Sequence, residues 1–208
     1  VSVTFTVEMA AKDLPPMSDL DDRTLDLART GDRRALRSLH DALARPVLGY
    51  ARGQGVEDPD ALANEALYRA LRDVGDFDGD AGKFRSWVFT IAHNLIIDDR
   101  RRRSRRPTTV PLDRGPERVS SVDLGDVAVA RVEAQRMRGW IEELSPDQRD
   151  VLLLRLVSDL PINDVAAIVS KRPGAVKALQ RRGVAALRRR LDAEGVSNDA
   201  SAAFTRVP

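Results

Sequence analysis

Apolar residues recur three and four positions apart along most of the chain, which predicts helices rather than strands. A short helix is expected to end near Thr30, with Ser18 and Asp19 as its cap, and a second helix is expected to start after Gly31. The apolar stripe of this second helix contains Leu36, Leu39, Leu43, Val47 and Tyr50. The pattern predicts an all-α fold.

Two longer helices are expected next. Asp58 and Pro59 are typical of a helix start, and the helix that they open continues through DPDALANEALYRALRDV. A polar loop then leads into residues 84–106, FRSWVFTIAHNLIIDDRRRRSRR, whose apolar residues again have helical spacing. We expect Trp87 to pack in the core. The six arginines near the end of this stretch are expected on a rigid helix rather than in a flexible tail.

The composition of residues 107–126, with three prolines, two glycines and few apolar residues, is typical of a linker. A helix is expected from about Val127 to Leu144, and SPDQ at 145–148 is a capping box that opens another. Beyond Pro161, the pattern predicts a short helix, a turn, and a longer helix from Pro173 to Leu191.

The length of 208 residues is sufficient for two small domains, each with a modest core. We expect two small helical domains joined by a flexible linker, with a disordered extension at each end. The expected boundaries are 1–17 for the first extension, 18–106 for the first domain, 107–126 for the linker, 127–192 for the second domain and 193–208 for the tail.

The composition excludes several kinds of site. The chain has no cysteine, which rules out disulfides, thiolate metal sites and cysteine nucleophiles. Aromatic residues make up only 4% and charged residues 32%, which argues against a wide aromatic ligand cavity. No apolar stretch reaches the roughly 18 residues that a membrane helix needs, and the start resembles no secretory leader. We therefore expect a cytoplasmic protein without cofactor, metal or membrane insertion, and a monomer when free.

Charge is segregated along the chain. Residues 57–80 contain eight acidic residues and two arginines, a net charge of −6. Residues 84–106 have a net charge of +5, and residues 171–191 have +8 with no acidic residue. Solvated helix faces usually mix both signs, so two separate basic segments predict two contacts with a polyanion. The acidic segment should avoid DNA and contact something else.

A short helix, a tight turn and a longer basic helix form a helix-turn-helix pattern, whose second helix enters the major groove of DNA. Most helix pairs bind no nucleic acid, but the charge of +8 on residues 171–191 favours DNA binding here.

Two other functions are compatible with parts of this pattern. The first is a transcriptional regulator that binds an operator through the helix-turn-helix alone. The N-terminal half would then be a sensor, yet it has no signal of a ligand pocket or phosphoacceptor. The second is an enzyme, but no nucleophile turn, metal spacing or glycine-rich phosphate loop accompanies His40 and His93, the only histidines.

Three stretches together resemble the extracytoplasmic-function (ECF) sigma factors of bacterial RNA polymerase. These are residues 58–103, the stretch LSPDQRDVLLLRLVSDLP, and VAAIVSKRPGAVKALQRRGVAALRRRL. The resemblance covers roughly residues 20–106 and 130–192. It implies a region 2 that binds polymerase core and melts the promoter −10 element, a linker, and a region 4 that reads the −35 element. It also implies an anti-sigma factor as a partner.

The resemblance places three surfaces on this chain. The polymerase-binding residues would be Asp60, Asn64, Glu65 and Tyr68. The −10 surface would comprise the loop 76–83 and Lys83, Arg85, Asn94, Asp98, Arg101, Arg102 and Arg105. The −35 surface would comprise Lys171, Arg172, Ala175, Lys177, Ala178, Arg181 and Arg182.

Two local details qualify these surfaces. Asp98 and Asp99 can pair with Arg101, Arg102 and Arg103 at helical spacing, whereas the other four arginines of residues 84–106 are expected to face DNA phosphates. In the predicted turn, Ser170 stands where the family usually has glycine, and Arg172 stands where it usually has a capping serine. Two outcomes are expected from this: either the turn is looser, or Pro173 by itself sets the start of the last helix.

Overall fold

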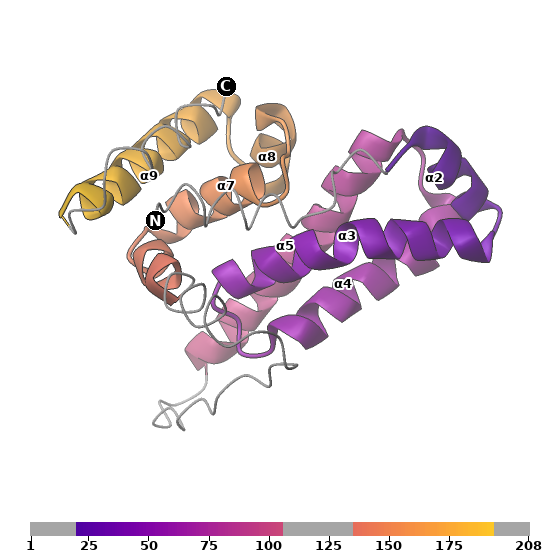
Figure 1. Ribbon diagram of the computed structural model, residues 1–208, viewed down its shortest axis with the longest axis horizontal. Coiled ribbons are helices and arrows are strands. Elements are labelled where there is room, and N and C mark those ends of the chain that lie inside the picture. The colour runs from indigo at the N-terminus through magenta and orange to yellow at the C-terminus, as the bar shows by residue number, and fades with distance from the viewer. Residues whose placement is uncertain (1–19, 106–134, 194–208) are drawn as a thin grey trace, which may run out of the picture.

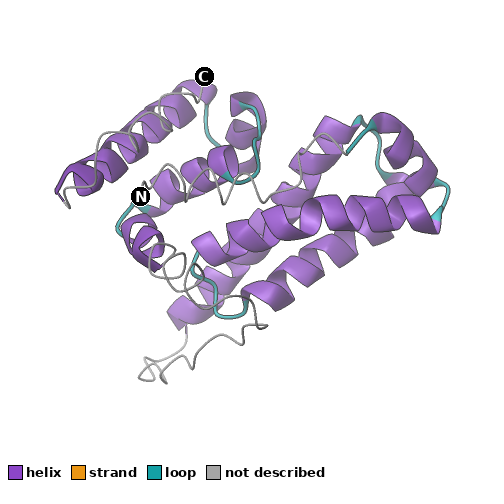
Figure 2. Cartoon of the chain, viewed as in Figure 1, coloured by secondary structure: helices purple, strands orange, loops and turns teal. Residues whose placement is uncertain are grey.

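The computed structural model describes residues 20–105 and 135–193, and every regular element within them is a helix, which confirms the all-α prediction (Figure 2). The helices of the N-terminal domain are α2 (Asp22–Arg29), α3 (Arg33–Gly53), α4 (Pro59–Arg72), the 3-10 turn η2 (Val74–Asp76) and α5 (Ala81–Arg105). Those of the C-terminal domain are a short helix at 135–142, α7 (Pro146–Leu156), α8 (Ile162–Ile168) and α9 (Pro173–Ala193).

Aspartates cap the N-termini of α2, α3 and α4. Asp32 accepts the backbone N–H of Ala35 at 2.8 Å to cap α3, and Asp58 caps α4 as predicted. The predicted cap of α2 is wrong: Asp21, not Ser18 or Asp19, accepts the N–H of Thr24. The neighbouring Leu20 and Leu25 are both buried, and this apolar pair on either side of Asp21 sets where the chain enters the helix.

In the N-terminal domain, α3, α4 and α5 pack together while α2 closes one end (Figure 1). The core between them holds large, fully buried side chains, among them Leu39, Val47, Phe84, Phe89 and Ile96. The helix α5 continues to Arg105 without a break, so five of the six arginines lie on this helix, as predicted, and Arg106 lies outside the described residues.

In the C-terminal domain, the predicted capping box is present at the start of α7. The hydroxyl of Ser145 accepts the backbone N–H of Gln148, and the side-chain oxygen of Gln148 accepts the backbone N–H of Ser145. The longest described helix of this domain, α9, packs against α7 and α8 (Figure 1). Its buried residues include Val176, Leu179, Gly183 and Leu187, the inward face that the periodicity predicts.

Several sequence predictions concern residues outside the described ranges. These are the linker at 107–126, the extension at 1–17, the tail beyond residue 193, and residues 127–134 of the helix predicted at 127–144. Of that helix, 135–142 is helical. The exact domain boundaries therefore stay predictions. No helix among residues 20–105 and 135–193 is long and apolar enough to cross a membrane.

The two domains lie against each other, with α7 on α3 and α8 on α5. Two glycines of α3 allow the close approach. A Cβ added at Gly53 would lie 2.7 Å from Leu153 Cδ2, and one at Gly49 would lie 3.2 Å from Val157 Cγ1. Because these glycines have no side chain, buried apolar residues of both domains form one continuous core.

Candidate nucleic-acid interface

The predicted polymerase-binding residues lie together on the exposed face of α4. Asp60, Asn64, Glu65 and Tyr68 are all exposed, and Tyr68 is 61% exposed, an unusual value for an aromatic side chain. Both carboxylates have surface ion-pair partners: Asp60 lies 3.5 Å from Arg52 and Glu65 lies 2.7 Å from Arg69. The guanidinium of Arg72 lies 5.8 Å from the centre of the Tyr68 ring. These exposed pairs contribute little stability, so the face is free to exchange partners.

The arginines at the end of α5 do not all point the same way. Arg101 and Arg102 are exposed and form only long ion pairs with Asp98 and Asp99, at 3.7 Å and 3.5 Å. Arg105 is exposed as well. The predicted helical pairing is therefore confirmed, and these three guanidinium groups remain accessible to phosphate.

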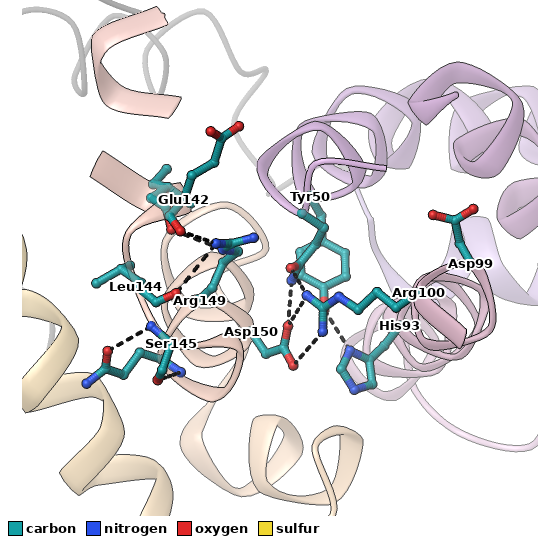
Figure 3. A network of polar contacts seen from close by, with 12 residues as sticks. Tyr50, His93, Asp99, Arg100, Glu142, Leu144, Ser145, Arg149 and Asp150 are labelled. Carbon is teal, nitrogen blue, oxygen red and sulfur yellow. Dashed lines mark hydrogen bonds and ion pairs between the residues drawn. The ribbon is translucent and has the colours of Figure 1, made fainter. Parts of the chain in front are cut away.

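The prediction that Arg100 faces DNA is wrong. Its guanidinium lies 3.0 Å from Asp150 of α7 and also donates to the side chain of Gln54 (Figure 3). The neighbouring Arg103 donates to the backbone carbonyl of Gly55 at 2.8 Å. Half-buried Arg85 likewise has a contact within the protein. The basic run is thus divided between an outer surface and inward structural contacts.

The loop 76–83, which we call the capture loop, leads into the first turn of α5. Lys83 at its end is exposed, as is Asn94 three turns along the same helix. Trp87 is half-buried, and its ring stacks on Phe77 with a centroid distance of 5.0 Å and an interplanar angle of 24°. Trp87 therefore packs inside the domain, as predicted, and its contact with Phe77 joins the capture loop to α5.

A buried polar network lies where the domains meet, and the sequence pattern did not reveal it (Figure 3). The Tyr50 hydroxyl lies 2.8 Å from Nδ1 of His93, and Gln54 donates to Asp150 at 2.9 Å. Burial lowers the pKa of His93 below its usual 6.5, although the nearby Asp150 opposes this effect. Burial also raises the pKa of Tyr50 well above 10. Gln54 and Asp150 carry no sequence motif that identifies their contact.

The helix-turn-helix consists of α8, the turn 169–172 and α9. Arg172, Ala175, Lys177, Arg181 and Arg182 are exposed, and Ala178 is half-buried beside them. Lys171 differs from the rest because its Nζ lies 2.9 Å from Asp147. Five of the seven predicted residues thus lie on α9 and Arg172 lies directly before it, all of them at least partly exposed, whereas Lys171 is held to α7.

The turn has the backbone conformation for which the family uses glycine. Ser170 has φ of +53°, in the left-handed region that L-residues seldom adopt. Arg172 stands at the cap position without a capping hydroxyl, and its carbonyl accepts the N–H of Val176 at 3.1 Å. Pro173 is the first residue of α9, as predicted.

At the far end of α9, Arg190 forms an ion pair with Glu143, which directly follows the helix at 135–142, whereas Arg189 is exposed. Within residues 20–105 and 135–193, no three histidine or acidic side chains gather in a way that could hold a metal ion.

Comparisons with known proteins give a consistent family. Residues 36–106 match the family Sigma-70 region 2, and residues 134–187 match Sigma-70, region 4. The chain is 30% identical over 190 residues to the ECF RNA polymerase sigma factor BldN of Streptomyces coelicolor, across 85% of this chain and 69% of BldN. It is 29% identical over 176 residues to the ECF RNA polymerase sigma factor SigD of Mycobacterium tuberculosis, across 81% of this chain and 82% of SigD.

A solved structure has the same fold. CnrH, solved in complex with the cytosolic domain of CnrY, superposes with a TM-score of 0.62 at 24% identity. The match covers 84% of this chain and 99% of the solved one.

Proposed function

The chain belongs to the ECF RNA polymerase sigma factors, and we propose that its three exposed surfaces divide the work of such a factor. As a member of this family it binds core RNA polymerase, recognises promoter DNA and initiates transcription; it is not an enzyme. In our proposal, the α4 face binds the core, the capture loop with α5 opens the −10 element, and α9 reads the −35 element.

The assignment of α4 to polymerase rests on its charge and exposure. Its face presents Asp60, Asn64, Glu65 and Tyr68 to solvent, and its two acidic residues would repel DNA. A protein partner can replace the weak surface pairs of these carboxylates and cover the exposed Tyr68 ring, since aromatic residues are common anchors in interfaces.

The −10 surface is assigned to the exposed side of α5. Lys83 and Asn94 can contact an unpaired strand, and Asp98 lies one turn beyond Asn94. Arg101, Arg102 and Arg105 then supply phosphate contacts at the upstream edge of melted DNA. A strand held in this way needs both a basic track and a place for an unstacked base, which the capture loop would supply.

The −35 surface rests on the accessible basic face of α9, the observation that most directly supports the whole proposal. Residues near the start of a recognition helix reach base edges, whereas residues near its end contact phosphates. We therefore assign base contacts to Arg172, Ala175, Lys177, Ala178 and Arg181, with Arg182 and Lys171 at the margins.

Competition binding of holoenzyme to a library of −35 sequences, at two or more salt concentrations, tests this assignment. Arg181→Ala should cost roughly 1–3 kcal/mol on the preferred sequence and reduce preference at one base position. Arg189→Ala should weaken all sequences about equally and reduce the salt slope by about one unit. A uniform loss in Arg181→Ala would move that residue to the phosphate contacts.

The remaining assignments follow from the family. We propose the cytoplasm as the location, because core polymerase and promoter DNA are there. We also propose an anti-sigma factor as a partner, by likeness to CnrH, whose solved structure contains a domain of a second protein, CnrY. An operator-binding regulator that acts without polymerase is not supported, because residues 36–106 match Sigma-70 region 2.

A further inference from the structure

The helix α2 contacts the capture loop. It precedes the segment that matches Sigma-70 region 2, which starts at residue 36. Arg29, the last residue of α2, reaches across 48 positions of sequence. Its Nε donates to the carbonyl of Phe77 at 3.1 Å, and its Nη2 donates to the carbonyl of Gly79. One guanidinium thus binds two backbone carbonyls of the loop through donors that are held in a fixed planar fork.

The guanidinium of Arg29 is itself fixed. Asp26, one turn earlier on α2, accepts from its Nη1 at 2.6 Å, and the Arg29 side chain is only 25% exposed. Its central carbon lies 5.8 Å from the centre of the Phe77 ring, which in turn stacks on Trp87. Arg29 therefore links the loop to α2 while Trp87 links it to α5.

A second contact from α2 fixes the other end of the loop. The carboxylate of Asp22 accepts the backbone N–H of Ala81, the first residue of α5, at 2.8 Å. Helix N-termini have N–H groups without partners inside the helix, so Asp22 supplies a cap for α5 from a distant element. Gly79 lies between the two contacts, with φ of +156°, and a Cβ there would lie 2.9 Å from the Phe77 ring.

The loop needs such contacts because of its own charge. Asp76, Asp78 and Asp80 are exposed within it, and a nearby DNA strand would repel all three. A loop that must receive an unstacked base while it carries acidic side chains gains from being ordered beforehand, since ordering on binding costs affinity.

We propose that Arg29 and Asp22 are positioning residues that hold the capture loop in its base-receiving form before the promoter opens. This inference rests on the proposed role of the capture loop. It assigns a role in melting to α2, a helix that contributes none of the DNA-contacting residues named above.

The first measurement concerns the loop itself, in the free full-length chain. Amide hydrogen exchange over residues 76–84 should be roughly tenfold faster in Arg29→Ala and Asp22→Ala than in the wild type. Asp22→Asn should retain slow exchange, because its amide oxygen can still accept from Ala81. Arg37→Ala is the matched control, since Arg37 is an exposed arginine of α3 for which no side-chain contact is present among the described residues.

The second measurement concerns promoter opening by holoenzyme. Arg29→Ala should open a fully paired promoter about tenfold more slowly, because the loop must be ordered during melting. The defect should fall to within about twofold on a template mismatched across the −10 element, and binding to core should not change. Arg37→Ala should match the wild type on both templates.

Two results would overturn the inference. One is exchange and opening in Arg29→Ala equal to those of Arg37→Ala. The other is an equal defect on paired and mismatched templates, which would mean that Arg29 only stabilises the fold. Lys83→Ala and Asn94→Ala separate this failure from that of the proposed −10 surface. If they are defective on paired templates while Arg29→Ala is normal, only the positioning role is lost; if they are normal too, the surface itself is misassigned.

Discussion

Arg100 and Asp150 form an ion pair between the two domains, with 3.0 Å between Nη2 and Oδ1. The Asp150 side chain is 10% exposed and that of Arg100 is 28% exposed, so the pair is mostly removed from water. Gln54 contacts both partners and supplies further hydrogen bonds to the buried charges. Such a pair is costly to break, because the partner that remains is buried without its counter-charge.

We expect Asp150→Ala to lower the free energy of unfolding by about 2 kcal/mol, below the usual cost for a fully buried pair because Arg100 is partly exposed. Asp147→Ala, which removes the exposed pair with Lys171 on the same helix, should cost about 1 kcal/mol or less. Denaturant unfolding of both variants measures the difference. Equal losses would show that the Arg100 pair contributes no more than a surface pair.

The contact between the domains must be lost on the promoter. The −10 and −35 elements are about 25 base pairs apart, which is roughly 85 Å of duplex. Domains with α8 packed on α5 cannot span that length. Because the chain has no cysteine, cysteines introduced at Arg45 of α3 and Leu156 of α7, two exposed positions beside the approach of Gly49 to Val157, allow specific labelling for energy transfer. We expect efficient transfer in the free protein and a clear decrease in the promoter complex.

A glycine variant should open the free protein in the same assay. Gly53→Leu places a side chain where Leu153 now lies, so transfer should already be low without polymerase. Gly139→Leu is the control, because no atom lies within 4 Å of a Cβ at that position. Unchanged transfer in Gly53→Leu would mean that the interface accommodates the added side chain, and that the glycines do not determine the approach of the domains.

Ser170 offers a stabilising substitution. Its φ of +53° is strained for an L-residue, and glycine adopts this region without the Cβ penalty. Glycine also has more freedom in the unfolded chain, which offsets part of the gain. We expect Ser170→Gly to stabilise the protein by about 0.5 kcal/mol, measured by thermal unfolding. Ser38→Gly, in the second turn of α3, should instead destabilise it by about 0.5 kcal/mol.

His93 should make stability depend on pH. Burial lowers its pKa in the folded protein, so the unfolded chain binds the proton more readily, starting near pH 6.5. Its contribution is therefore complete above pH 6.5 and is lost as the pH falls from there towards the lowered pKa. The slope should reach up to about 1.4 kcal/mol per pH unit. Both Asp150 and Arg100 act on His93 and oppose each other.

His93→Gln should remove this dependence between pH 6.5 and 5, since glutamine can still accept from the Tyr50 hydroxyl and does not titrate. The control is His40→Gln at the other histidine of the chain, which lies outside the buried network beside Asp41. A slope that persists in His93→Gln would assign the dependence to other groups.

Charge reversal on α4 tests the polymerase surface. Asp60→Lys with Glu65→Lys should strongly weaken co-purification with core polymerase, because the acidic face becomes basic, while the fold is retained. The matched control is Asp41→Lys with Asp192→Lys, which reverses two exposed carboxylates on other helices. Equal co-purification of the two double variants would contradict the assignment of α4.

The helices, their order and the family could all be predicted from local sequence patterns. Caps such as Asp58 and Ser145, and apolar stripes such as that of α9, depend on neighbours within a few residues, so they can be read locally. The rigid basic end of α5 and the exposed face of α9 followed from the same helical spacing. The cap of α2 was predicted at Ser18 or Asp19, but it is Asp21. The helix starts there because Leu20 is buried, and no local pattern predicts this burial.

The role of each charged side chain could not be predicted in this way, because it depends on contacts between distant parts of the chain. Arg100 and Arg101 are adjacent and chemically identical, yet one is bound to Asp150 and the other is exposed. Likewise, nothing around Arg29 indicates that it binds carbonyls 48 and 50 positions away. The physical reason is that the environment of a charge depends on groups that the fold brings close from distant parts of the chain. Helical spacing fixes only the direction in which a side chain leaves its own helix.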